Sequence, residues 1–145
     1  MLGLGGGLTG VTVDWVVVIC EEWRLSEREN YWIWVGTSIG FVLVGISMCQ
    51  FVSAAAEGSG IPPVRAILSG LYLKNMLSWW TYFGKLVGIT AMLCSGLSLG
   101  KEGPFVHMAS IIADNLPWRL VHGNNHTLRH QLLTAAIAVG VTATF

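Results

Sequence analysis

Long apolar runs, separated by short charged or glycine-rich breaks, form the main pattern along the 145-residue chain. The longest run without a charged residue, 31–56, is long enough to cross a bilayer as a tilted helix, because about 20 apolar residues span the hydrocarbon core. The pattern therefore predicts a set of membrane helices. We expect the end of a span at 1–20, a span at 31–56, a short helix at 61–74, a span at 77–99, a half-helix at 103–116 and the start of a truncated helix at 127–145.

The last apolar run, from Leu132 to Phe145, has no cap and no polar end. We interpret residues 1–145 as a single partial transmembrane domain that is cut inside this helix. Composition supports a membrane class, since 53% of residues are apolar and only 11% are charged, against about 25% charged residues in soluble domains. The predicted fold class is an all-α, multi-pass integral membrane protein with broken helices, in either the plasma membrane or an intracellular membrane.

A charged, glycine-flanked pentapeptide, Gly100-Lys101-Glu102-Gly103-Pro104, interrupts the apolar pattern near its centre. Proline suits the first position of a helix, so the pentapeptide predicts a helix start that places Glu102 beside an N-terminus. The helix that follows would be about 20 Å long, shorter than the roughly 30 Å of the hydrocarbon core. We therefore expect a half-helix that starts inside the membrane. An ionisable group at that depth is typical of a functional site.

A second break, Gly58-Ser59-Gly60-Ile61-Pro62-Pro63, also combines glycine, proline and a short helix. Two broken helices in separate apolar segments indicate a binding site near the middle of the membrane. The exposed N–H groups and partial positive charge of helix N-termini attract anions, so the ligand is expected to be an anion. Ser59 adds a hydroxyl donor without a full charge, which suits an ion that must also leave.

In order and spacing, the two breaks and the Phe105-Val106-His107 that follows resemble the CLC family of voltage-gated chloride channels and proton/chloride antiporters. The resemblance implies the N-terminal part of a CLC-type inverted-repeat domain. It also implies a homodimer with one pathway in each subunit, with chloride and the lipid bilayer as partners. It implies transport without covalent chemistry, so we expect no enzymatic activity and no cofactor. The net charge of zero argues independently against nucleic acid as a partner.

The resemblance also assigns roles to residues at the two breaks. Glu102 matches the gating glutamate, whose carboxylate occupies an anion site and moves aside or is protonated for conduction. The residues expected to bind the anion, mainly through backbone groups and the Ser59 hydroxyl, are Gly58, Ser59, Gly60, Ile61, Lys101 and Gly103. Passive chloride permeation and proton-coupled exchange both stay open, because the family's inner proton-transfer glutamate falls after Phe145.

Two single residues and a group of histidines also bear on the predicted site. Pro63 stands where the family usually has glutamate, and we expect it to move the start of the short helix one residue along the chain. Lys85 lies alone in an apolar run and is expected to snorkel or to lie in a loop.

The alternative function is a membrane metalloenzyme with ligands at His122, His126 and His130, although Gly123-Asn124-Asn125 favours a turn between them. Apart from this alternative, we expect no metal site.

Overall fold

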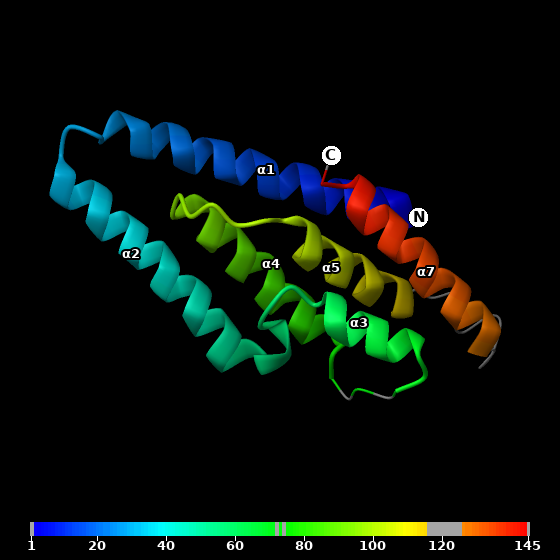
Figure 1. The fold of residues 1–145 in the computed structure, drawn as a ribbon. Helices are drawn as coiled ribbons and strands as arrows, with labels where there is room; N and C mark the ends of the chain where they lie inside the picture. The colour runs from blue at the N-terminus through cyan, green and yellow to red at the C-terminus, as the bar shows by residue number, and fades with distance from the viewer. Residues whose placement is uncertain (1, 72, 74, 116–125, 145) are drawn as a thin grey trace.

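The computed structural model describes residues 2–71, 73, 75–115 and 126–144, and its helices are shown in Figure 1. The helical elements are α1 (Leu2–Ser26), α2 (Tyr31–Ser47), a π-helical turn (Met48–Val52), a 3-10 turn (Ala54–Ala56), α3 (Ile61–Leu68), α4 (Trp79–Cys94), α5 (Glu102–Asp114) and α7 (His126–Thr142). No strand occurs among the described residues. The all-α prediction is confirmed.

Several bounds differ from the predicted ranges. α1 continues through the charged residues after 20 and ends at Ser26, since its last turns lie at the surface, where charges stay solvated. α3 ends six residues before the predicted 74, and α4 ends before the predicted 99. Gly70 and Gly96, which have φ of 96° and 81°, follow these two helix ends. A left-handed residue after the C-cap stops a helix, and glycine adopts that conformation at little cost.

α5 lies at the centre of the molecule and packs against α1, α3, α4 and α7 (Figure 1). Phe105, Met108 and Ile111 of α5 form a buried cluster with Val13 of α1 and Tyr82 of α4. On its other side, small residues bring α5 and α7 together. A Cβ atom added to Gly140 would lie 2.5 Å from the Cα atom of Val106, so glycine is needed for this close approach.

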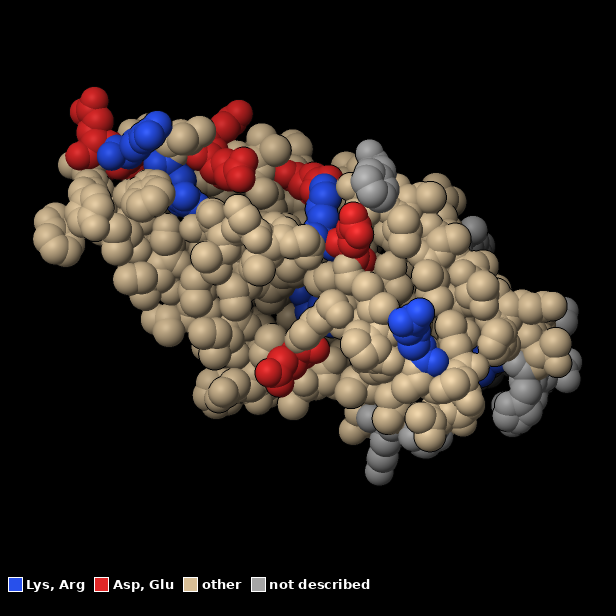
Figure 2. All heavy atoms as spheres, in the orientation of Figure 1, with Lys and Arg blue, Asp and Glu red and all other residues tan. Residues whose placement is uncertain are grey.

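α1 and α2 diverge from their connection, and α4 packs against both of them (Figure 1). The helical segments Gly3–Ser26 and Tyr31–Val52 are long and apolar enough to cross a membrane, and few of their residues are buried in this structure. Charged side chains gather at the end where α1 meets α2, whereas the surface over α2 is otherwise uncharged (Figure 2). This distribution suits helices whose outer faces meet lipid or other helices rather than water.

Candidate functional site

The two glycine- and proline-containing breaks of the sequence lie in direct contact. A Cβ atom added to Gly103, at the start of α5, would lie 2.6 Å from the Ser59 Cβ atom and 3.1 Å from the Ser59 carbonyl oxygen. No side chain fits in this space. The start of α5 and the loop before α3 therefore meet because residue 103 is a glycine.

The contact forms part of the wall of a cavity of about 660 Å³ between α2, α3, α4 and α5. Five of the predicted site residues line it, namely Gly58, Ser59, Ile61, Glu102 and Gly103. Gly60 and Lys101 do not. Gly60 packs instead against the ring of His107, and the Lys101 ammonium lies 2.9 Å from a carboxylate oxygen of Asp14 on α1.

α3 begins at the first residue of the predicted range 61–74, without the shift expected from Pro63. α3 begins at Ile61 and contains Pro62 and Pro63 in its first turn, so Pro63 does not move the helix start along the chain. First-turn N–H groups have no intrahelical acceptor, and two prolines are tolerated there for that reason. The Ile61 N–H remains and donates a long bond of 3.4 Å to the Ser59 Oγ.

Glu102 is the first residue of α5 and is exposed towards the cavity. Within the described part of the chain, its carboxylate has no hydrogen-bond or ion-pair partner. A helix N-terminus stabilises a negative charge. Among the described residues, Glu102 is also the only acidic one in the wall of the cavity, so its carboxylate and an anion would compete for the same space.

The prediction that Lys85 snorkels or lies in a loop is wrong. Lys85 is in the middle of α4 and only 3% exposed. Its ammonium donates to the Gly58 carbonyl oxygen at 2.9 Å and lies 3.0 Å from Nδ1 of His107. Of the residues that the structure describes, Lys85 is also the only basic one that lines the cavity. In the sequence, a lone lysine inside an apolar run indicated an unusual position. The sequence could not identify its partners, because they come from two other segments of the chain.

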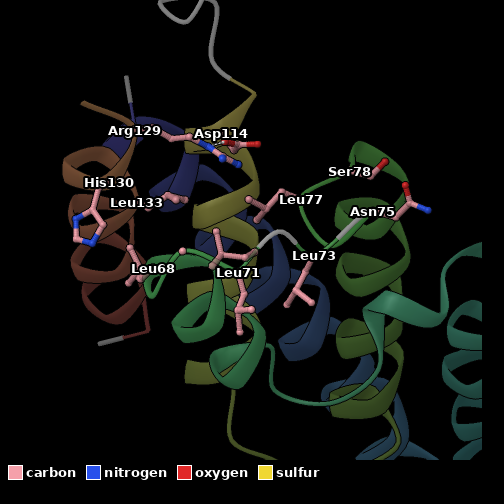
Figure 3. Close-up of a pocket in the computed structure, with 12 residues that line it drawn as sticks. Leu68, Leu71, Leu73, Asn75, Leu77, Ser78, Asp114, Arg129, His130 and Leu133 are labelled. Atoms are coloured by element: carbon pink, nitrogen blue, oxygen red, sulfur yellow. Dashed lines mark hydrogen bonds and ion pairs between the residues drawn. The ribbon is translucent and has the colours of Figure 1, made fainter. Parts of the chain in front are cut away.

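A second cavity, of about 460 Å³, lies at the opposite ends of α3 and α5 and is shown in Figure 3. Leucines of α3, the following loop and α7 surround it, and Arg129 donates from Nε to Asp114 at 2.7 Å on its border. His130 also lines this cavity, while His122 lies outside the described residues. Among the described residues, no group of three or more His, Cys, Asp or Glu side chains could hold a metal ion.

Comparison with known proteins gives one consistent family. Residues 40–145 match the family described as voltage gated chloride channel. Chloride channel protein clh-3 of Caenorhabditis elegans is 44% identical over 121 residues, which cover 79% of this chain and 12% of that protein. Human chloride channel protein 2 is 35% identical over 157 residues, which cover 100% of this chain and 18% of that protein.

The fold agrees with this family. The crystal structure of a eukaryotic CLC transporter superimposes with a TM-score of 0.85 at 33% identity, and the match covers 99% of this chain and 29% of that chain. The chain spans between 12% and 18% of the length of the curated relatives it matches.

Proposed function

Because this chain belongs to the voltage-gated chloride channel family, which consists of membrane-embedded channels and transporters rather than enzymes, we propose that it lines a pathway for passive chloride permeation with Glu102 as the gate. The rest of the pathway would come from further segments of a longer protein. This chain would supply the N-terminal part of the membrane domain. The family resemblance also supports a homodimer with a separate pathway in each subunit.

The observation that carries this proposal is the contact between Ser59 and Gly103 at the wall of the 660 Å³ cavity. It brings two helix starts, each with partial positive charge and no full charge on its backbone, to one place. The Ser59 hydroxyl can donate to an anion there, because its oxygen already accepts from Ile61. The Lys85 ammonium in the same wall adds a positive charge, so the cavity favours an anion once the Glu102 carboxylate is protonated or has moved aside.

Electrostatic repulsion explains how Glu102 would act as a gate. An ionised carboxylate and a chloride about 4 Å apart repel each other by roughly 4 kcal/mol at an effective dielectric constant of 20. The two charges therefore do not occupy adjacent positions in the cavity at the same time. Chloride enters when the Glu102 side chain swings aside or takes up a proton. A single carboxylate at the start of α5 is enough for this mechanism.

Proton-coupled exchange is the second candidate function, and the similarity to a solved CLC transporter supports it. In that case Glu102 would carry a proton across part of the pathway rather than only open it. The two functions differ in one measurable quantity. An exchanger moves protons uphill when a chloride gradient is applied, whereas a channel does not.

Vesicles that contain the complete protein provide the test. With a potassium ionophore present to balance charge, we expect rapid chloride release into a low-chloride solution and no release of a large organic anion such as gluconate. Simultaneous recording of external pH separates the channel from the exchanger. If these vesicles retain chloride to the same extent as protein-free vesicles, the chloride pathway is refuted in both forms.

A further inference from the structure

A buried histidine connects the two sides of the candidate site. His107 of α5 is 0% exposed, and each of its ring nitrogens has a partner. Nε2 lies 2.9 Å from the carbonyl oxygen of Met76, in the loop between α3 and α4, and Nδ1 lies 3.0 Å from the ammonium of Lys85. His107 does not line the cavity itself.

The chemistry of these partners determines how the protons are arranged. A carbonyl oxygen can only accept, so Nε2 must carry a proton and donate it to Met76. The Lys85 ammonium can only donate, so Nδ1 must be unprotonated and accept. The ring is therefore neutral, in a single tautomer, and held at both ends. Such a ring is a rigid hydrogen-bond acceptor for the Lys85 ammonium.

The Lys85 ammonium has three N–H donors, and the structure shows where two of them go. One binds His107 and another binds the carbonyl oxygen of Gly58, the residue before Ser59. The latter bond holds the Gly58 carbonyl oxygen, with its partial negative charge, against the Lys85 ammonium. Gly58 has a φ of 71°, which a glycine adopts freely and which allows this orientation. The third donor has no partner among the described residues, and Lys85 lines the cavity in which the anion would bind.

We propose that His107 is a positioning residue of the anion site, which fixes the Lys85 ammonium at the cavity wall and, through it, the orientation of the Gly58 carbonyl. The inference rests on the proposed anion pathway and deepens it. The contact between His107 and Gly60 supports the same role, since a Cβ atom added to Gly60 would lie 2.5 Å from Cβ and Nδ1 of His107. The ring thus supports the loop that carries Ser59 as well as the lysine.

The test measures chloride flux against chloride concentration for variants of the complete protein in vesicles. The half-saturating concentration reports on the site and does not depend on how much protein is present. We expect His107→Leu and Lys85→Met each to raise it about tenfold, the size expected when one hydrogen bond to a charged group is lost. His107→Gln, whose amide can both accept and donate, should stay within about twofold of the wild type.

A double variant and a control separate positioning from packing. If His107 acts through Lys85, then Lys85→Met/His107→Leu should match Lys85→Met alone. Ser110→Ala is the matched control, because Ser110 is also 0% exposed on α5 but bonds only within its helix, to Val106 at 2.8 Å. It should leave the half-saturating concentration unchanged. A full additional loss in the double variant, or an unchanged value in His107→Leu, would overturn the proposal.

If His107→Leu folds poorly, the amount of folded protein in the double variant still tests the proposal. A buried ammonium that loses one of its two acceptors is costly, whereas the removal of both the ammonium and the ring that faces it can be nearly neutral. We then expect Lys85→Met/His107→Leu to accumulate better than His107→Leu, and equally poor accumulation of the two would count against the proposal. An absence of chloride flux from the wild-type protein would instead refute the proposed function, so the two failures are distinguishable.

Discussion

The ammonium of Lys101 lies 2.9 Å and 3.1 Å from the two carboxylate oxygens of Asp14, and it thereby joins α1 to the residue that precedes Glu102. Both side chains are partly exposed, at 33% for Lys101 and 50% for Asp14. Exposed ion pairs contribute about 0–1 kcal/mol, so this pair adds little to the stability of the fold. The pair lies beside the proposed gate at the start of α5, so its removal should affect chloride entry more than stability.

Asp14→Asn should lower the half-saturating chloride concentration of the complete protein by about twofold at low ionic strength, because the freed Lys101 ammonium attracts chloride to the gate. The effect should fade when an impermeant salt is added, since exposed charges are screened over about 8 Å at physiological ionic strength. Flux measurements at two ionic strengths check this. Asp14→Glu keeps the charge and serves as the control, and an equal shift in that variant would contradict the electrostatic explanation.

Gly103→Ala should separate the start of α5 from the Ser59 loop. The added methyl group would lie 2.6 Å from the Ser59 Cβ atom, and overpacking of this kind costs about 1–3 kcal/mol. We expect lower thermal stability in detergent and a strong loss of chloride flux. Gly7→Ala is the matched control, because a methyl group there has nothing within 4 Å in this structure. Normal flux in Gly103→Ala would mean that this contact does not form part of the pathway.

Ser59→Ala should change the selectivity among anions. The variant removes an O–H donor that would face an ion without its full hydration shell, a loss of about 1.5–3 kcal/mol for a hydrogen bond to a charged group. Relative permeabilities for chloride, bromide and nitrate measure the effect. Ser69→Ala, near the other end of α3, removes a hydroxyl that bonds only to Ala66 and should leave selectivity unchanged. If both variants behave like the wild type, Ser59 is not in the pathway.

Glu102→Gln should leave the gate open, since the amide keeps the shape of the side chain but removes its charge. In a channel, chloride flux should lose most of its dependence on external pH. In an exchanger, chloride should still pass while proton coupling disappears. Recording chloride and proton movement together across a range of external pH tests both forms, with the wild-type protein as reference. A variant that keeps the wild-type pH dependence would show that another group controls the gate.

The sequence alone determined the class of the fold and the positions of the two helix starts. Apolar run length and composition report on neighbouring residues, and a membrane helix depends mainly on those neighbours. Glycine and proline likewise act locally, so the breaks at Gly58 and Gly100 could be located without a structure. The helix bounds were less accurate, because left-handed glycines such as Gly70 and Gly96 become visible only with the backbone.

Tertiary structure decided which of these local features meet. The contact of Ser59 with Gly103 and the pairing of Asp14 with Lys101 join residues far apart in the chain, and no periodicity encodes them. Lys85 shows this most clearly: as a lone charge in an apolar run it was interpreted as snorkelling. Packing of α4 against α5 and the Ser59 loop instead gives it two buried partners, Gly58 and His107. A buried charge is stable only when such partners surround it, and only the fold brings them together.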